Sequence, residues 1–311
     1  MARTANCVKS ARVSGARVRL PPGNGVFDSS GACRRRSPMA LPISCYIRTK
    51  NEEHNIARAI TAARRVAEEV IVIDSGSTDR TVELAVAAGA RIVKAPWRGW
   101  GKQKRIGEDA CKHDWVLDLD ADEVVSAPLA QEIQSLFAAG NPAHSVYEMH
   151  MATIPPVGRP WLTFNLVDRR KLYDRRVIRQ PDHAVWDQFK TPKNVSVGKL
   201  HALLLHYSFR NLDELNTKFT RHSDASAGES QRPLWLIKLR ILVGWQAYFF
   251  NQYIRRGLWR AGWYGLLVAK IAAHGRWLKD ARMLERSLQS ADSALSATDG
   301  NPHGVGSLKS Q

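Results

Sequence analysis

Three alternating carboxylates end an apolar run near the middle of the chain, in the stretch WVLDLDADE at residues 115–123. Asp118, Asp120 and Asp122 carry like charges that repel one another unless a positive charge lies between them. A divalent cation would supply that charge, because Mg²⁺ and Mn²⁺ take hard oxygen ligands and are often held by one or two carboxylates together with substrate phosphates. The alternative is a solvated strand-to-helix turn in which Asp120 or Asp122 caps the next helix. A D-x-D pair alone does not decide between these interpretations.

A repeated alternation of strands and helices must position these carboxylates. Apolar segments at residues 43–48, 70–74, 91–94 and 115–120 alternate with helices that contain Ile56 and Ile60, that run from about Asp79 to Ala88, and that end at about Cys111. Strands that are apolar almost throughout are buried on both faces by crossover helices, which is typical of a parallel sheet. The first half of the chain therefore predicts a doubly wound α/β domain.

In such a sheet, ligands bind beyond the carboxyl ends of the strands. Three polar clusters fall at those ends: Thr49–Glu52, Asp74–Asp79 and Asp118–Asp122. No GxxxxGK[ST] loop is present and no GxGxxG follows the first strand, so the sequence argues against a P-loop or a Rossmann dinucleotide site. Glu52 and Asp74 can instead accept hydrogen bonds from a base or ribose. For Ser77 and Asp79 we expect helix capping.

The strand ends and loops resemble family 2 glycosyltransferases of the GT-A fold. The resemblance is carried by TKNEEHNI, VIVIDSGSTDRTVELAVAAGARIV, the W-x-G-W-G-x-Q-K loop and WVLDLDADEVVS, covers residues 41–138, and continues more weakly to about residue 285. It is greatest to the branch that adds sugars to the inner core of lipopolysaccharide. It implies a nucleotide-diphospho-sugar transferase fold, with a Rossmann-like, mostly parallel sheet and flanking helices.

The resemblance also implies a donor site. Glu52 and Asp74 would contact the nucleoside, and Asp120 and Asp122 would hold ribose and a Mg²⁺ or Mn²⁺ ion on the donor diphosphate. The full predicted nucleotide-sugar set is Thr49, Glu52, Asp74, Gly76, Gln103 and Asp120, and the predicted metal ligands are Asp122 and Asp120. Arg105 stands where the family usually has Asn, so it is left out of the site.

Inverting transfer needs a base that takes the proton of the acceptor hydroxyl. The family places an acidic residue in a short V-H-[DE] segment after a basic strand, and here the corresponding segment reads Val185-Trp186-Asp187. Asp187 is the predicted catalytic base, and His183 is the second candidate. Asp187 as an ordinary surface carboxylate is the alternative. His206, in an H-Y-S segment, can contact the diphosphate or serve as a structural imidazole.

The implied activity is that of a metal-dependent, inverting enzyme of the hexosyltransferase class. It would move a sugar from a nucleotide-diphosphate sugar, for which we expect a UDP-sugar, to a hydroxyl of a lipopolysaccharide-core or other lipid-linked glycan. The alternative is a non-catalytic protein that binds sugar nucleotides or lipid and retains the GT-A fold.

The formal net charge of +17 favours an anionic partner. Nucleic acid is not expected, because no zinc-finger spacing or RNA-recognition consensus is present and much of the excess charge lies before residue 39. The segment 229–286 holds five of the ten Trp, and its longest uncharged run, 241–254, is shorter than the roughly 18–20 apolar residues of a membrane span. We predict amphipathic helices that lie on an anionic surface, at the cytoplasmic face of the inner membrane. Ordinary packing of these helices on the catalytic domain is the alternative.

The predicted organisation has four segments. Residues 1–38 form a basic leader, with eight Arg or Lys against the single acid Asp28. This leader is expected to be disordered, or untranslated if the protein starts at Met39. Residues 39–228 form the GT-A catalytic domain and residues 229–286 the aromatic, basic helical region. Residues 287–311 are expected to be a disordered polar tail.

Overall fold

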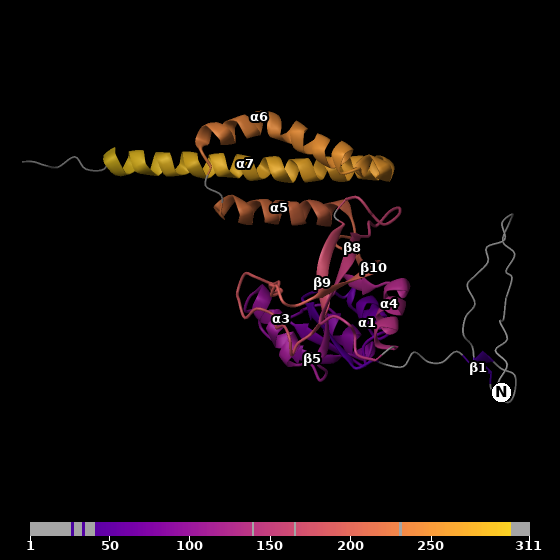
Figure 1. Cartoon of the computed structure of the whole chain (residues 1–311). Coiled ribbons are helices and arrows are strands. Elements are labelled where there is room, and N and C mark those ends of the chain that lie inside the picture. Colours follow the sequence, from indigo (N-terminus) through magenta and orange to yellow (C-terminus); the bar gives the residue numbers. More distant parts are fainter. Residues whose placement is uncertain are drawn as a thin grey trace, which may run out of the picture.

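The computed structural model describes residues 26–27, 33–34, 41–138, 140–164, 166–229 and 232–299. At its centre lies a mixed eight-stranded sheet in the order β5-β4-β3-β6-β9-β8-β10-β7. Helices cover both faces of this sheet, and the long C-terminal helices are stacked beyond one end of it (Figure 1). The predicted α/β class, with a mostly parallel sheet, flanking helices and further C-terminal helices, is confirmed.

One half of the sheet is parallel and follows the predicted alternation closely. It consists of β3 (Ile43–Thr49), β4 (Glu69–Asp74), β5 (Arg91–Lys94) and β6 (Trp115–Asp120), with helices α1 (Ile56–Ala63), α2 (Thr81–Ala87) and α3 (Trp100–Asp109) between them. Alternate strand residues enter different cores: Cys45 and Ile47 pack with α1, and Tyr46 packs on the side of α3. Burial on both faces explains why these strands read as continuous apolar runs.

The other half mixes strand directions. It contains β7 (Glu123–Val125), β8 (Val146–Thr153), β9 (Val167–Asp174) and β10 (Val197–His206), with helix α4 (Ala127–Ala138) after β7. β9 runs antiparallel to both β6 and β8, whereas β8 and β10 are parallel. Because β9 lies directly beside β6, its side chains stand next to Asp118 and Asp120, the two of the three carboxylates that belong to β6.

The C-terminal helices form a separate layer above the ends of β8, β9 and β10 (Figure 1). This helical layer contains α5 (Leu212–Glu229), α6 (Leu234–Phe250), the π-helix η1 (Asn251–Arg255), the 3-10 helix η2 (Leu258–Ala261) and α7 (Gly262–Asp299). Trp161 and Phe164, from the loop after β8, pack with Phe209, Leu258 and Val268 in one cluster. This cluster joins the helical layer to the sheet.

Two predicted boundaries need correction. Helix α7 continues to Asp299, well into the segment expected to be a disordered tail. Residues 287–299 contain no Gly or Pro, and Gly300 and Pro302 follow, so the helix ends where helix-breaking residues begin. Helix α2 begins at Thr81 rather than near Asp79, because Asp79 Oδ1 accepts the Thr81 N–H as a local cap (3.0 Å).

The leader is described only at Val26–Phe27 and Cys33–Arg34, two short strands that pair antiparallel. The rest of residues 1–40 and residues 300–311 lie outside the described residues, so the predicted disorder of those segments stays a prediction. Within the described chain, no helix is both long and apolar enough to cross a bilayer.

Candidate active site

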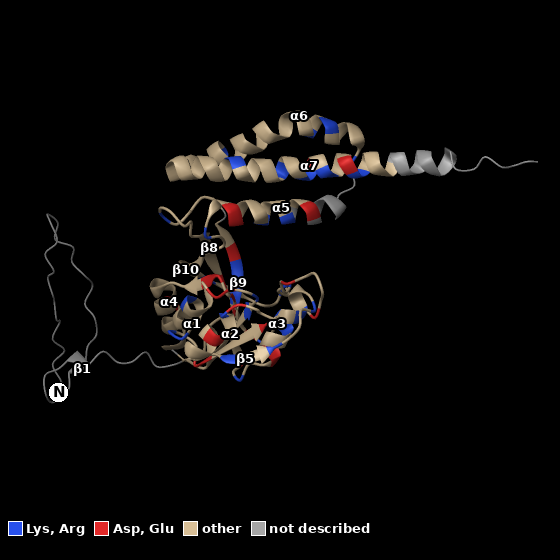
Figure 2. Cartoon of the chain, turned by 180° about the vertical axis from the view of Figure 1, so that it is seen from behind, with Lys and Arg blue, Asp and Glu red and all other residues tan. Residues whose placement is uncertain are grey.

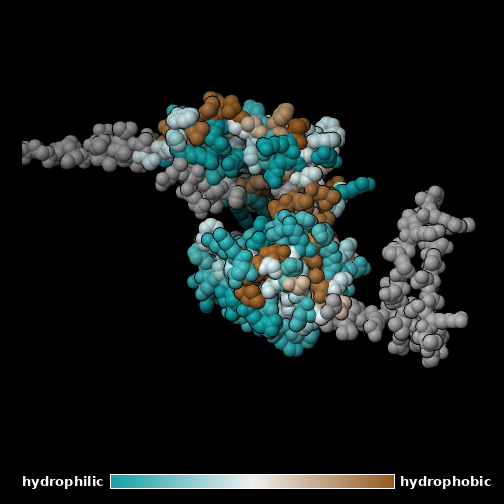
Figure 3. All heavy atoms as spheres, in the orientation of Figure 1, coloured by the Kyte–Doolittle hydropathy of each residue, from teal (hydrophilic) through white to brown (hydrophobic). Residues whose placement is uncertain are grey.

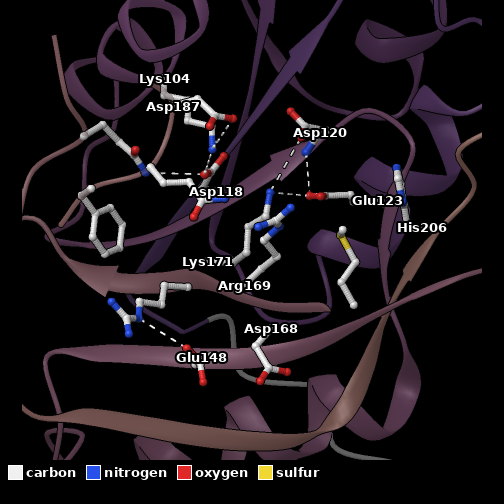
Figure 4. A pocket seen from close by; sticks show the side chains of 15 residues that line it. Lys104, Asp118, Asp120, Glu123, Glu148, Asp168, Arg169, Lys171, Asp187 and His206 are labelled. Atoms are coloured by element: carbon white, nitrogen blue, oxygen red, sulfur yellow. Dashed lines mark hydrogen bonds and ion pairs between the residues drawn. The ribbon is translucent and has the colours of Figure 1, made fainter. Parts of the chain in front are cut away.

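Neighbouring strand ends meet at one edge of the sheet, as predicted. Thr49 pairs with Asp74 across β3 and β4, and Arg48 pairs with Asp120 across β3 and β6. A cavity of about 500 Å³ opens on the β9 side of this edge. Its walls are mostly charged and come from α3, β6, β8, β9, the segment 180–189 and the end of β10 (Figure 4).

The loops after β3 and β4 are tied together by hydrogen bonds. The Asn51 N–H donates to Ser77 Oγ (2.9 Å), and Asn51 Oδ1 accepts the Thr78 N–H (2.8 Å). The Glu53 N–H donates to Asp79 Oδ2 (3.2 Å). Asn51 has a positive φ of 56°, which Asn tolerates better than most residues. The polar residues of both loops therefore hold the rim of the strand ends in one arrangement.

The two predicted nucleoside contacts are already positioned within these loops. Asp74 is buried, and its carboxylate accepts the N–H groups of Gly76 (3.1 Å) and Ser77 (3.2 Å), where Gly76 supplies a φ of 93°. The Glu52 carboxylate accepts the Asn55 side-chain amide (2.9 Å), and burial raises the pKa of Glu52 above its usual value. Both carboxylates stand beside the strand ends rather than in the charged cavity.

Gln103 and Thr49 lie just behind this rim. Gln103 is fully buried, and its amide nitrogen donates to Ser75 Oγ (2.9 Å) and to the Ala95 carbonyl (3.0 Å). Within the described structure, the buried atoms Gln103 Oε1 and Thr49 Oγ1 lack a hydrogen-bond partner. Gln103 therefore joins α3 to the Asp74 loop, which is a positioning contact.

Asp120 lies in a network of cations. The Arg48 guanidinium contacts it through Nε (2.9 Å) and Nη2, and Lys171 Nζ lies 3.8 Å from Asp120 and 2.8 Å from Glu123. Burial alone would raise the pKa of Asp120, but Arg48 and Lys171 outweigh it and hold that pKa below the usual range. Asp120 is therefore a carboxylate whose charge is already balanced by protein.

A second set of ion pairs links two carboxylates of the cavity through one lysine. Lys104 Nζ lies 2.8 Å from Asp118 and 3.7 Å from Asp187 (Figure 4). Lys104 and Asp118 are both buried, whereas 40% of the Asp187 side chain is exposed. A buried lysine therefore anchors the predicted base to the strand, and the outer part of the Asp187 carboxylate stays accessible from the cavity.

The chain reaches Asp187 through a loop that is packed on the start of α3. The N–H of Trp100 donates to the Ala184 carbonyl (2.8 Å), and the N–H of Lys102 donates to the His183 carbonyl (3.1 Å). A Cβ at Gly101 would lie 2.6 Å from the Pro181 oxygen and 2.8 Å from the His183 oxygen. The glycines of the W-x-G-W-G-x-Q-K motif thus allow this loop to sit against α3.

The two base candidates differ in their placement. Asp187 lines the cavity, and His183 is not among the lining residues. His183 Nδ1 accepts the N–H groups of Val185 and Trp186, each at 3.1 Å, so the imidazole shapes the turn that presents Asp187. The geometry favours Asp187 over His183 as the group that can reach a substrate.

Asp122 faces His206, at the end of β10. The His206 Nε2 atom lies 3.2 Å from Asp122 Oδ2, and the Tyr207 N–H donates to the Asp122 carbonyl (2.8 Å). Burial would lower the pKa of His206, but the hydrogen bond with Asp122 raises it above the usual value. The Asp122 carboxylate is an oxygen donor of the kind that binds Mn²⁺ or Mg²⁺, and the His206 imidazole is a nitrogen donor that a transition metal such as Mn²⁺ accepts more readily than Mg²⁺ does.

Asp122 and His206 are therefore the side chains best placed to bind a metal ion. Among the described residues, no three His, Cys, Asp or Glu side chains are gathered so that they could hold an ion. Asp120 is engaged by Arg48 and Lys171 and is the less available of the two predicted ligands. A site with few protein ligands suits an ion that also binds substrate phosphates.

The predicted site residues thus fall into two groups. Asp120 and Asp187 line the cavity, while Asp122 stands beside it; Thr49, Glu52, Asp74, Gly76 and Gln103 form the neighbouring rim. Sequence reasoning gave no role to Arg48, Lys104, Lys171 and Glu123. Lys104 ends a motif that the sequence displays plainly, but its partner 83 residues along the chain does not show in any local pattern.

Comparison with known proteins decides the family. A model of the family described as "Glycosyl transferase family 2" matches residues 44–193. An uncharacterized glycosyltransferase of Rickettsia felis is 32% identical over 260 residues, which covers 80% of this chain and 91% of that protein. The chain belongs to glycosyltransferase family 2. This family 2 glycosyltransferase transfers a sugar from a nucleotide-sugar donor, and the predicted family is confirmed.

Further relatives of this family 2 glycosyltransferase are more distant. The lipopolysaccharide core biosynthesis glycosyltransferase LpsC of Rhizobium meliloti is 29% identical over 276 residues, covering 82% of this chain and 98% of LpsC. The crystal structure of glucosyl-3-phosphoglycerate synthase from Mycobacterium tuberculosis with Mn²⁺, UDP and glucosyl-3-phosphoglycerate aligns at 21% identity and a TM-score of 0.37. That alignment covers 56% of this chain and 74% of that one.

Proposed function

We propose that this chain is an inverting, metal-dependent glycosyltransferase that moves a sugar from a UDP-sugar to a hydroxyl of a lipopolysaccharide-core or other lipid-linked glycan. The observation that carries the proposal is that Asp187, a partly exposed carboxylate, lines one cavity at the strand ends together with Asp120 of the D-x-D pair and with His206, which lies 3.2 Å from Asp122. An inverting transfer needs these two elements side by side, a base for the acceptor and a binding point for the donor.

Each residue has a distinct task in this reaction. Asp187 accepts the proton of the acceptor hydroxyl as its oxygen bonds to the anomeric carbon, and the bond from that carbon to the nucleoside diphosphate breaks with inversion. Lys104 holds Asp187 in place through an ion pair (3.7 Å). Asp122 and His206 would hold the metal, and a metal bound there would supply Lewis-acid stabilisation for the negative charge of the leaving diphosphate. Glu52 and Asp74 hold the nucleoside.

Turnover tests this assignment directly. The purified chain should release UDP from a UDP-sugar in the presence of Mn²⁺, faster with a lipopolysaccharide-core extract than without it, and chelation by EDTA should stop the release. Asp122→Asn should lose this activity, while Asp213→Asn, a change at an exposed carboxylate of α5, should keep it. Binding of UDP-sugars with no release under any of these conditions would instead favour a non-catalytic binding protein.

The lipid-linked acceptor is supported by the composition of the helical layer. Between residues 233 and 290 ten Lys or Arg stand against two acids, Asp280 and Glu285. Asp280 is buried and paired with Arg240 (3.0 Å) and Arg232 (3.4 Å), so Lys and Arg outnumber Asp and Glu among the charged residues on the surface of α6 and α7 (Figure 2). The name of LpsC points to the same class of acceptor for that relative.

Large apolar side chains stand exposed among these basic residues. Brown surface gathers along the upper edge of the helical layer in Figure 3, where Figure 1 places α6. The exposed apolar residues include Trp235 (67%), Leu242 (72%), Phe250 (65%) and Trp263 (82%). Interleaved Trp, aliphatic and basic side chains suit the interface of an anionic bilayer. We propose that this layer docks on such a bilayer at the cytoplasmic face of the inner membrane.

Flotation with phosphatidylglycerol vesicles tests the docking. The chain should float at low salt and less at high salt, because salt screens the attraction of Lys and Arg to lipid. Trp259→Ser with Trp263→Ser should reduce flotation, while Val86→Ser, a change at an exposed apolar residue of α2, should not. A wild-type chain that stays at the bottom at low salt contradicts the proposal.

A further inference from the structure

The basic run from residue 169 to residue 179 is divided by its contacts. Most of its cations are committed to protein partners: Arg170 to Glu148 and Thr191, Lys171 to Glu123, Arg175 to the carbonyls of Glu108 and Cys111, Arg176 to Asp174, and Arg179 to Glu108 and Asp109. Arg169 differs from all of these. Within the part of the chain that the structure describes, its guanidinium has no hydrogen-bond or ion-pair partner, although its backbone pairs with Met149 in the sheet.

Arg169 is also placed where a ligand would reach it. It lines the cavity and is only partly exposed. Because β9 runs antiparallel to β6, residues that precede Lys171 lie toward the carboxyl end of β6, where the D-x-D pair stands. Figure 4 shows the Arg169 guanidinium alongside the Lys171 side chain, on the same side of β9. Two cations thus point toward the strand ends, and only Lys171 is paired.

The acidic residues of the cavity do not supply the missing partner. Six carboxylates line it, and each lies within 4.0 Å of another basic side chain: Asp118 and Asp187 of Lys104, Asp120 of Arg48, Glu123 of Lys171, Glu148 of Arg170, and Asp168 of His150. A partly buried guanidinium beside a second cation is unfavourable without an anion. Among the described residues no carboxylate of the cavity is left unpaired for Arg169, so a bound anion would complete this arrangement.

We propose that Arg169 is the phosphate-binding residue of the cavity and grips a phosphate group of a substrate. A guanidinium presents a planar fork of N–H donors that matches two phosphate oxygens, which suits it to this role better than an ammonium. The inference rests on the proposed function for the identity of the substrate, but the anion site itself rests only on the geometry of Arg169.

Two substrates carry such a group. The diphosphate of the nucleotide sugar is one, since it must lie near the D-x-D pair, and a phosphorylated sugar of the acceptor is the other. The shared chemistry is a phosphate oxyanion at the β9 wall of the cavity. The two possibilities can be distinguished by experiment. If Arg169 binds the donor diphosphate, bound UDP occupies the site, whereas if Arg169 binds the acceptor, the site can still take a phosphate after UDP is bound.

Three variants test the site by isothermal titration of the full chain. Arg169→Gln removes the charge, Arg169→Lys keeps the charge but loses the fork, and Arg65→Gln is the matched control. Arg65 is exposed after α1, where the chain returns to the start of β4 and so to the opposite edge of the sheet. The probes are uridine, UDP and inorganic pyrophosphate on the free protein, and inorganic phosphate on the protein saturated with UDP and Mn²⁺.

Loss of one charge-assisted contact should weaken a phosphate probe about 10- to 100-fold in Arg169→Gln and less in Arg169→Lys, and leave uridine unchanged. Weaker UDP and pyrophosphate assign Arg169 to the donor diphosphate. Unchanged UDP with lost phosphate binding to the UDP-saturated protein assigns it to the acceptor.

Affinities that match Arg65→Gln for every probe overturn the proposal, as does a wild-type chain that binds neither pyrophosphate nor phosphate. A chain that binds these anions through Arg169 but transfers no sugar leaves the anion site standing and removes the proposed function instead.

Discussion

On the parallel half of the sheet the buried Asp74 carboxylate is oriented by near neighbours in the sequence, whereas on the antiparallel half the charged cavity is assembled from distant residues. Asp74 accepts N–H groups two and three residues away. Lys171 reaches Glu123 across 48 residues, and His206 reaches Asp122 across 84. Local turns can be formed by a short sequence alone, but a buried ion pair exists only when two segments are brought together. The orientation of Asp74 is therefore set locally, whereas the contacts between the rim loops, such as Asn51 with Ser77, and the ion pairs of the cavity are tertiary.

The largest effect is expected at the carboxylate that the antiparallel side presents. Asp187→Asn should lower turnover about 10²- to 10⁴-fold, because an amide cannot accept the hydroxyl proton. UDP affinity should stay unchanged, since the nucleoside rim is formed by other loops. The matched control is Asp182→Asn, an exposed carboxylate in the same loop, which should keep the wild-type rate. A wild-type rate for Asp187→Asn would remove it as the base.

The buried ion pair beneath Asp187 should matter for folding as well as for activity. Lys104→Met leaves Asp118 buried without its cation, so the free energy of unfolding should fall by about 3–5 kcal/mol in urea titration. Adding Asp118→Leu should recover much of that loss. For comparison, Arg80→Met breaks an exposed pair with Glu83 and should change nothing measurable. If Lys104→Met also leaves the free energy of unfolding unchanged, the buried ion pair of the cavity is no more important for stability than the exposed pair on α2.

The packing of the 181–187 loop on α3 predicts that Gly101→Ala lowers turnover, although helix propensity alone predicts that Ala stabilises a helix relative to Gly. Gly101→Ala places a Cβ against the carbonyls of Pro181, His183 and Trp186, so the loop must move and turnover should fall about 100-fold. Gly244→Ala in α6 meets only the Arg240 side chain at 3.8 Å and should be neutral or slightly stabilising. Equal activity of both variants would show that the loop is not held in this way.

The smallest effect is expected on the parallel half, at the edge opposite the site. Glu69 accepts hydrogen bonds from Arg91 (2.8 Å), Ser44 (2.8 Å) and the Lys112 N–H (2.9 Å). Burial would raise the pKa of Glu69, but these contacts lower it below the usual value near 4.5. Its stabilisation is therefore present above pH 4.5 and is lost as the pH falls through the lower folded value.

Glu69→Gln should accordingly cost less than about 1 kcal/mol at pH 7, since solvent screens this partly exposed carboxylate. The difference from the wild type should disappear in acid. Thermal unfolding across a pH series measures both values. A difference that persists or grows at low pH would contradict the assigned direction of the pKa change.

The sequence supported the parallel half in detail for a physical reason. Strands buried on both faces need continuous apolar runs, so β3, β4 and β6 could be located within a residue or two. The strand-end clusters follow from that placement, because parallel strands bring their carboxyl ends to one edge. The resemblance to family 2 then supplied Asp187, which no periodicity would have selected.

What the sequence by itself determined is the alternation of apolar runs and polar strand ends, because burial and turn formation act over a few residues. Only the tertiary structure decided which charges meet. It placed Lys104 between Asp118 and Asp187, assigned His183 to a turn rather than to the cavity, and left Arg169 as the unpaired cation of a basic run within the described residues. Electrostatic energy depends on the distance between charges and on their burial. Both are set by tertiary packing, such as that of β9 beside β6, and not by the order of residues in the sequence.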